Sequence, residues 1–247
     1  MRVLICGRIS IEHEGGVVTE SAFPGRLGRR LWAYLVLQRR RPVSRGELVD
    51  ALWGDASPEA ADASLNALVS RVRTAIAPLA VDRAELRAAT GTYSLHLAAD
   101  MFVDRERAWS AINHVQALQR EGRLADAWAE AIIANEIAAR GFLAGEDAPW
   151  IEAERRTLRD IELQALDAVC EAELAQRRPL EAERVARRLI TVDPLRESGY
   201  RHLMRAARDA GNGAQAIAIM EECRAALAAV SVRPSAVTER LFRELVH

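Results

Sequence analysis

The sequence contains no lysine, so all 34 of its basic residues are arginine. Arginine makes bidentate contacts to phosphates and guanines, and a basic surface on this chain would suit such contacts. Cysteine is also scarce: the three thiols form neither an even set nor a paired zinc spacing, which indicates free, buried thiols rather than a disulfide framework. No wholly apolar run exceeds Leu31–Leu37, far below the roughly 20 residues of a membrane span, and the first residues lack a signal-peptide cleavage pattern. We therefore expect a cytoplasmic protein without a membrane partner.

The length and charge distribution indicate two domains of different character. A chain of 247 residues, half of them hydrophobic and 28% charged, is long enough for two folded domains. The net charge of -1 hides an asymmetry, because residues 1–99 hold 13 arginines against 10 acidic residues while residues 100–247 hold 21 against 25. Positive charge thus collects in the first part, where it suits a nucleic-acid surface, and the acid excess of the second part disfavours one.

The first part of the chain predicts a small sheet followed by helices. Alternating apolar residues over positions 3–11 and a glycine-containing turn at 14–16 predict short strands. Helical spacing predicts a first helix over Leu27–Gln38. A capping box, Ser44-x-x-Glu47, predicts a short second helix that ends near Trp53.

A third helix and a hairpin complete this part. Ser57 followed by Pro58 predicts a helix start, with regular helix over residues 62–77. Its apolar stripe fixes which side faces the core, and strands at 85–89 and 93–97 flank a turn that contains Gly91. The stripe consists of Leu65, Val69, Val72 and Ile76; Ser70, Arg71 and Thr74 lie opposite, with Asn66 and Arg73 at the edges.

From residue 104 onward the pattern is almost wholly helical. Breaks rich in glycine and proline predict about seven helices. Two segments align at a separation of 34 residues, matching Ala182 to Ala216 and Leu189 to Cys223. This spacing is the period of tetratricopeptide (TPR) repeats, so the expected fold is mainly α: an α+β part with a sheet, three helices and a hairpin, followed by a TPR-like helical domain.

Longer motifs in the same order resemble known regulators. GRRLWAYLVLQRRRPVSRGELVDALWG at 28–54, SLNALVSRVRTAI at 64–76 and a hairpin with Thr-Tyr-x-Leu resemble the OmpR-like winged-helix DNA-binding domain. APWIEAERRTLRDIELQALDAVCEAEL at 148–174 and VRPSAVTERLFREL at 232–245 are similar to the bacterial transcriptional activator domain. The two domains in this order, expected over 1–99 and 104–247, resemble the Streptomyces antibiotic regulatory protein family.

The resemblance implies a sequence-specific, DNA-binding transcriptional regulator, with activation favoured. Its third helix would enter the major groove of double-stranded DNA, and the family's Ser-Arg-x-Arg falls on Ser70, Arg71 and Arg73. The helical domain would contact RNA polymerase, another protein or a second copy in a homodimer. The hairpin departs from its relatives with Ala89 and Thr92, so Arg87 is its only basic residue. The candidate DNA-binding residues are Asn66, Ser70, Arg71, Arg73, Thr74 and Arg87.

Catalytic and cofactor signatures are absent from the sequence. There is no nucleophile elbow, phosphate loop or dinucleotide fingerprint, and the histidines have no ligand spacing. We expect no enzyme, cofactor or metal. Two alternatives stay open: a TPR-like protein–protein adaptor whose winged-helix unit is structural, and an effector-sensing repressor, which would require a pocket among residues 104–247.

Overall fold

The chain opens with a four-stranded sheet. The computed structural model describes residues 1–79 and 84–246. Strands β1 (Arg2–Leu4), β2 (Ser10–His13), β3 (Gly16–Thr19) and β7 (Phe102–Val103) pair in the order β3-β2-β1-β7, with β7 parallel to β1. Inward-facing Val3 and Ile11 are completely buried. The small N-terminal sheet expected from residues 3–19 is confirmed.

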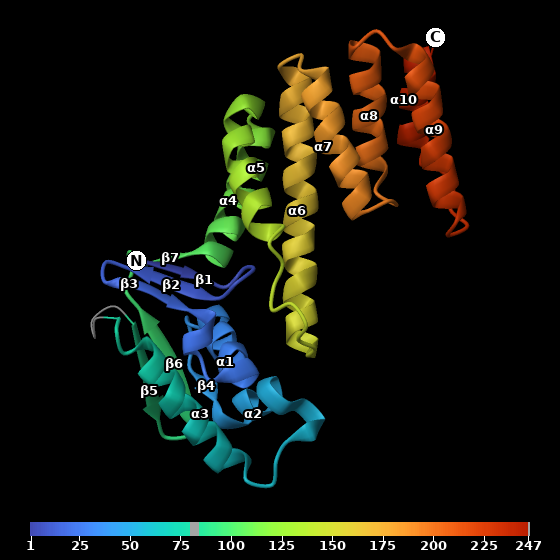
Figure 1. Cartoon of the computed structure of the whole chain (residues 1–247). Helices are drawn as coiled ribbons and strands as arrows, with labels where there is room; N and C mark the ends of the chain where they lie inside the picture. Colours follow the sequence, from blue (N-terminus) through green and yellow to red (C-terminus); the bar gives the residue numbers. More distant parts are fainter. Residues whose placement is uncertain (80–83, 247) are drawn as a thin grey trace. The chain divides into compact units, whose positions relative to one another are not determined.

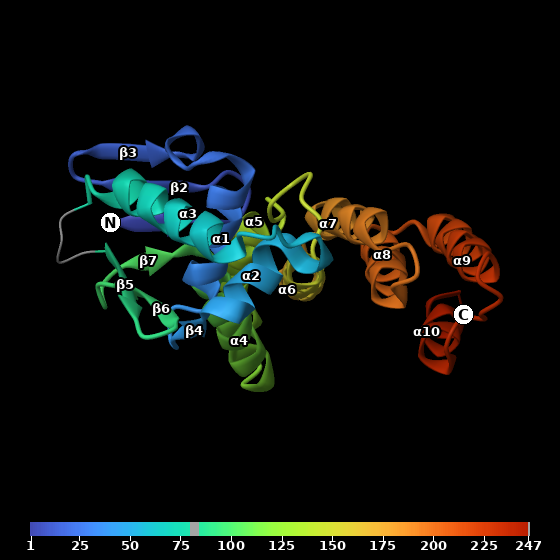
Figure 2. The ribbon, with the colours of Figure 1, turned by 90° about the horizontal axis from the view of Figure 1, so that it is seen from below.

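Three helices and a second sheet follow, as in a winged helix (Figure 1). Helix α3 packs against α1, α2 and strand β5 (Figure 2). The second sheet has the order β4-β6-β5, and β5 and β6 form the expected hairpin around Gly91. The elements are η1 (Glu20–Ala22), α1 (Gly25–Leu37), β4 (Val43–Ser44), α2 (Arg45–Trp53), η2 (Gly54–Ala56), α3 (Ala61–Ile76), β5 (Ala84–Ala89) and β6 (Thr92–Leu97).

The two predicted helix caps have different outcomes. The Ser44 hydroxyl accepts a hydrogen bond from the Glu47 amide at 3.1 Å, as the capping box predicts. The start predicted at Ser57 and Pro58 is wrong, because η2 ends at Ala56 and α3 begins at Ala61 without a side-chain cap. Residues 57–60 instead form a non-helical connection that ends in a turn, and the regular helix begins within one residue of the expected position 62.

Seven helices lie between residues 104 and 246 of the described chain, in agreement with the breaks in the sequence. Antiparallel pairs α7–α8 and α9–α10 stack on one another, and the residues aligned at the 34-residue period, such as Ala182 and Ala216, are fully buried. No helix among residues 1–79 and 84–246 has the length and apolar content to cross a membrane. The helices are α4 (Asp104–Arg120), α5 (Leu124–Ala138), α6 (Pro149–Ala175), α7 (Pro179–Val192), α8 (Glu197–Asp209), α9 (Gly213–Ala228) and α10 (Ala236–Val246).

The chain divides into two compact units whose limits differ from the expected domains. Unit 1 comprises Met1–Arg107 and Arg140–Thr157, and unit 2 comprises Ala108–Ala139 and the chain from Leu158 onward. The predicted boundary between 1–99 and 104–247 therefore does not coincide with the units. We call residues 140–157 the return segment, because the chain comes back through them to the winged helix.

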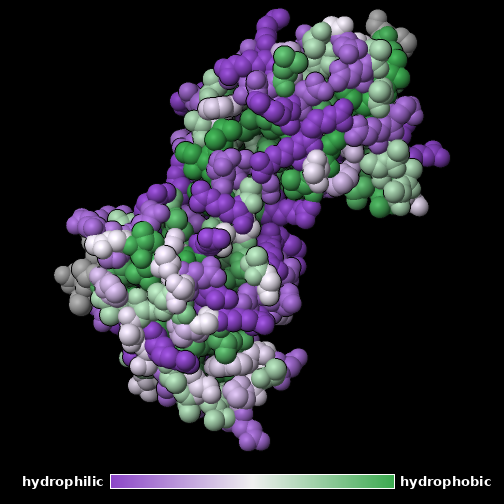
Figure 3. Space-filling model, viewed as in Figure 1, coloured by the Kyte–Doolittle hydropathy of each residue, from purple (hydrophilic) through white to green (hydrophobic). Residues whose placement is uncertain are grey.

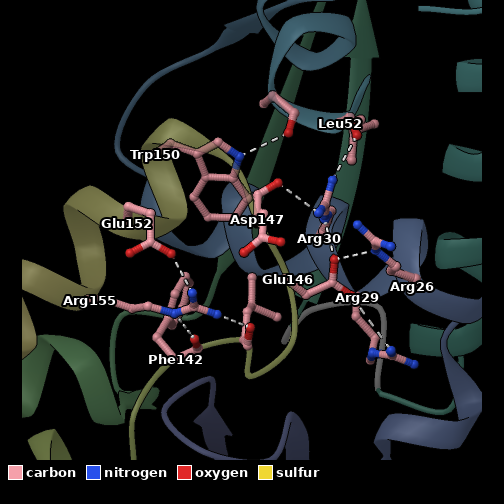
Figure 4. Close-up of polar contacts among 12 residues, drawn as sticks. Arg26, Arg29, Arg30, Leu52, Phe142, Glu146, Asp147, Trp150, Glu152 and Arg155 are labelled. Carbon is pink, nitrogen blue, oxygen red and sulfur yellow. Dashed lines mark hydrogen bonds and ion pairs between the residues drawn. The ribbon is translucent and has the colours of Figure 1, made fainter. Parts of the chain in front are cut away.

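A buried carboxylate fastens the return segment to α1. Glu146 is 4% exposed and receives hydrogen bonds from Arg26 at 2.6 Å and Arg30 at 2.5 Å (Figure 4). Arg30 also donates to the carbonyl oxygens of Leu52 and Asp147. One guanidinium thus joins α1, the end of α2 and the return segment inside unit 1, and burial makes each of these bonds strong.

Aromatic packing adds to this attachment. The Trp150 indole donates to the Ala51 carbonyl at 2.9 Å, and its ring meets the ring of Tyr34 edge-on at 5.0 Å. Phe142 forms a β-bridge with Cys6 and also contacts Trp150 edge-on. Sequence reasoning missed these partners. The apolar spacing around Phe142 and Trp150 does not show whether these residues pack on the N-terminal domain or on the helical domain.

Substitution Glu146→Gln is expected to destabilise unit 1. Arg30 would lose its carboxylate partner in a buried site, and since it keeps two carbonyl partners we expect the lower end of the usual cost, about 3 kcal/mol of unfolding free energy. Urea unfolding followed by tryptophan fluorescence measures the change. Glu12→Gln, which breaks the exposed pair with Arg2, is the control and should cost less than about 1 kcal/mol. Equal costs for the two variants would contradict the assignment.

Stability should also depend on the ionisation of Glu47. Arg41 hydrogen-bonds this carboxylate, with Tyr34 adding a bond at 2.7 Å, and lowers the pKa of Glu47 to about 2. Because the folded-state pKa lies below the ordinary value of 4.5, the stabilisation is complete above pH 4.5 and disappears as the pH falls toward 2. Glu47→Gln should therefore be less stable than the parent chain at pH 7, with the difference shrinking below pH 4.5. Urea midpoints across this range test it, with the exposed Glu136→Gln as control.

Candidate nucleic-acid interface

The buried stripe of α3 determines which of its side chains can meet a ligand. Leu65, Val69, Val72 and Ile76 are each at most 4% exposed, as expected, and Leu68 joins them. These residues face α1, α2 and β5, so the helix is fixed in rotation by its packing. The opposite face of α3 is open to solvent.

Three of the candidate residues occupy this open face. Ser70, Arg71 and Thr74 are all exposed. The Thr74 hydroxyl donates to the Ser70 carbonyl at 3.2 Å within the helix, which leaves its oxygen lone pairs available as acceptors. Within the part of the chain that the structure describes, Arg71 has no hydrogen bond or ion pair. Its guanidinium can therefore engage a ligand without breaking an internal contact.

Arg73 lies at the edge of α3 and is already engaged. Its Nε donates to the Leu86 carbonyl of β5 at 2.9 Å. This bond ties α3 to the hairpin. It uses one of the five N–H groups of the Arg73 guanidinium. The two arginines of the Ser-Arg-x-Arg motif thus differ in their surroundings.

Asn66 belongs to a network that sequence reasoning did not find. Its amide oxygen accepts hydrogen bonds from Arg45 at 3.0 Å and from the Tyr93 hydroxyl at 3.1 Å. Arg45 also pairs with Asp62 at 3.0 Å, and its backbone amide donates to Gly91 in the hairpin turn. The network links the start of α2, the first turns of α3 and the hairpin. No local pattern signals it, since the partners lie 17 to 48 residues apart.

The remaining basic candidates are largely paired. Arg87, on β5, forms an ion pair with Glu85 at 2.7 Å, and this hydrogen bond raises the pKa of Arg87 and lowers that of Glu85. In the run at 39–41, Arg39 binds Glu106 at 2.6 Å and Arg41 binds Glu47. The middle arginine is 82% exposed and lies 3.8 Å from Glu106. Most of this run therefore stabilises unit 1 rather than offering free charge.

The described residues contain no group of histidine, cysteine and acidic side chains placed to hold a metal. The open face of α3 instead offers one unpaired guanidinium and two hydroxyls on a helix that is held on its other side. An α-helix of this kind fits the major groove of B-form DNA. The arrangement suits recognition rather than catalysis.

Two family models match the chain. Residues 103–246 match the bacterial transcriptional activator domain, and residues 26–91 match the transcriptional regulatory protein, C terminal family. Both are families of regulators and not of enzymes, in agreement with the expectation from the sequence.

Curated relatives point the same way. Regulatory protein AfsR of Streptomyces coelicolor is 30% identical over 200 residues, which cover 81% of this chain and 20% of AfsR. Regulatory protein AfsR of Streptomyces griseus is 27% identical over 205 residues, with the same shares. The chain thus spans one fifth of the length of these relatives.

A solved structure shares the fold. Mycobacterium tuberculosis EmbR in complex with a low affinity phosphopeptide superposes with a TM-score of 0.86 at 23% identity, over 98% of this chain and 64% of EmbR. The activator-domain model alone covers more than half of the 247 residues. The chain belongs to the bacterial transcriptional activator domain family and is similar to the Streptomyces antibiotic regulatory proteins.

Proposed function

We propose that this protein is a sequence-specific transcriptional activator that reads the major groove with α3. The observation that carries the proposal is the open face of that helix, where Ser70, Arg71 and Thr74 lie opposite a fully buried stripe. Burial of the stripe supports an orientation in which this open face meets DNA. The basic side chain that this orientation presents without an internal partner among the described residues is Arg71.

The chemistry of these side chains matches base edges. A guanidinium donates two parallel hydrogen bonds to O6 and N7 of guanine, which no other base pair offers in the same pattern. The hydroxyls of Ser70 and Thr74 can donate to or accept from bases and phosphates. We assign Arg71 to direct base readout and the two hydroxyls to supporting contacts.

Arg73, Asn66 and Arg87 take secondary roles in this proposal. Arg73 holds the hairpin through Leu86 and can give a second N–H to a phosphate. Asn66 fixes the start of α3 through Arg45 and Tyr93. Arg87 contributes little because Glu85 neutralises it. Affinity would then depend on few charges and specificity on one arginine.

Unit 2 is proposed to contact a protein, either RNA polymerase or a second copy of the chain. The acid excess of residues 100–247 disfavours DNA, and stacked helix pairs present extended surfaces. A groove of about 750 Å³ is lined by residues of α6, α8 and α10, including Arg201, Arg205 and the 59% exposed Val237. Apolar residues also lie among hydrophilic ones over the visible face of the helices (Figure 3). Mixed polar and apolar surfaces of this kind suit protein partners.

An adaptor remains the second candidate function, in which the winged helix is structural. The observation in its favour is that Arg39, Arg41, Arg73 and Arg87 all have internal partners, which leaves little free positive charge. A selection from random DNA with the purified full chain discriminates the two. Recovery of a defined motif supports the regulator, and failure to enrich any sequence supports the adaptor.

Arg71→Ala is expected to weaken binding to the selected site by about 1 to 3 kcal/mol and to relax preference at one base position. The reason is the loss of a bidentate contact to guanine. Fluorescence anisotropy on the selected and a scrambled site measures it, after circular dichroism has verified folding. Arg233→Ala, an exposed change in unit 2, is the control with equal loss of charge. Parent-like binding by the Arg71→Ala, Arg73→Ala double variant would exclude the recognition-helix assignment.

Arg73→Ala should behave differently from Arg71→Ala. We expect affinity to fall on every sequence, and the slope of log K against log salt to become shallower by roughly one unit, because a phosphate contact is lost. The lost bond to Leu86 should also lower the unfolding free energy by about 1 kcal/mol. Salt titrations and urea unfolding on the same preparation separate the two effects. A sequence-selective loss would reassign Arg73 to base reading.

A further inference from the structure

Unit 1 contains a cleft whose residues the proposed function does not use. Its volume is about 560 Å³, which falls in the range of small-molecule sites. Three segments line it: the turn after β1 (Gly7, Arg8, Ile9), the region of η1 and α1 (Glu20, Arg29), and the return segment from Arg140 to Arg155. Figure 4 shows the side of this region formed by Arg29, Phe142, Glu146 and Arg155.

Positive charge dominates the lining, which holds four arginines and two glutamates. Both glutamates are already paired: Glu20 lies 3.3 Å from Arg29, and Glu146 is bound by arginines of α1. Arg155 is paired with Glu152. In the described part of the chain, Arg8 and Arg140 have no carboxylate within ion-pair distance. Arg8 and Arg140 are therefore the two arginines of the lining without an ion-pair partner, and the buried Asp104 carboxylate attracts Arg140 only at longer range.

The position of Arg140 is set by close packing against Gly7. Gly7 has a φ of +79° and donates its amide to the Gly141 carbonyl at 2.8 Å. A Cβ at this position would lie 3.1 Å from the Arg140 Cβ, so a glycine lets the two segments approach. The nearby Asp104 carboxylate accepts hydrogen bonds from the amides of Ile5, Cys6 and Arg105, and the positive charge of Arg140 acts on it only at longer range, without a hydrogen bond or ion pair.

The far wall of the cleft is a constrained loop. Leu143 has a φ of +42° although it is not glycine, and Gly141 and Gly145 also lie in the left-handed region. Arg155 donates to the carbonyls of Phe142 and Leu143 and holds the loop in this conformation. Strained backbone held by a buried scaffold is a common feature of ligand sites.

We propose that this cleft binds a small organic phosphate, a phosphate monoester or nucleotide, whose dianionic group lies between Arg8 and Arg140. Two guanidinium groups that form no ion pair within the described chain match the double charge of a phosphate monoester. The volume exceeds that needed for inorganic phosphate alone, and the exposed Ala144 of the lining offers apolar contact to the organic part. The site is an effector site, and it does not depend on the proposed DNA readout by α3.

Occupancy would stabilise unit 1. A ligand that bridges the turn after β1 and the return segment binds only when both are in place, so it shifts the equilibrium toward the folded unit by mass action. The return segment contacts α1, and α1 packs on α3. An organic phosphate is thereby expected to raise the fraction of chains with a correctly held recognition helix.

Calorimetric titration of the full chain with adenosine monophosphate tests the proposal, at constant ionic strength. We expect saturable binding of the nucleotide, weaker binding of inorganic phosphate and none of adenosine. Arg8→Gln and Arg140→Gln should each raise Kd at least about tenfold, because each removes one charge-assisted contact. Arg233→Gln, which removes one exposed charge in unit 2, should leave Kd unchanged.

Three outcomes would overturn the proposal. One is the absence of saturable binding by both phosphate probes; another is equal binding by the parent and the Arg8→Gln and Arg140→Gln variants. The third combines two results: the parent chain binds no small phosphate, and the Arg8→Gln and Arg140→Gln variants lose DNA affinity with a shallower slope of log K against log salt. This outcome would assign both arginines to contacts with the DNA backbone. Circular dichroism of each variant confirms folding, and since both side chains are exposed the fold should persist.

Discussion

The buried carboxylate of Glu146 is the contact on which the rest of unit 1 depends. It sits among three arginines of α1, at 2.6 Å from Arg26, 2.5 Å from Arg30 and 3.8 Å from Arg29. Removal of this charge would leave the Arg30 guanidinium buried without its carboxylate partner, whereas Arg26 is exposed to solvent. Since α1 is also the helix against which α2 and α3 pack, the return segment helps to fix the position of α3.

Local patterns in the sequence were sufficient for most secondary structure and for the orientation of α3. The apolar residues Leu65, Val69 and Val72 recur at helical spacing, and burial of such a stripe follows from the hydrophobic effect alone. The capping box at Ser44 and the 34-residue repeat were equally readable, since the first lies within one helical turn and the second is a regular repetition of the sequence pattern. Each concerns neighbours in the chain or a repeat of one unit.

Tertiary partners were not readable in the same way. Helical spacing places Arg71 opposite the apolar stripe and Arg73 at its edge, but the bond from Arg73 to the Leu86 carbonyl follows only from the structure. Likewise Glu146 looks like an ordinary loop carboxylate in the sequence, and nothing local indicates that it pairs with residues 116 to 120 positions away. An arginine-rich sequence adds to this ambiguity, because every acid has several candidate partners of identical chemistry.

The three buried thiols are divided between the two units, so their rates of modification can report the opening of each unit separately. Cys6 lies buried in the bridge to Phe142, whereas Cys170 and Cys223 lie in the core of the helical repeats. Burial raises the pKa of all three thiols, that of Cys223 to about 11, so each is nearly inert while its surroundings stay closed. Modification by a thiol reagent then requires local opening, and its rate reports the free energy of that opening. Detachment of the return segment would expose Cys6 and leave the thiols of the helical repeats buried. The rate of Cys6 modification would therefore report how often this segment detaches.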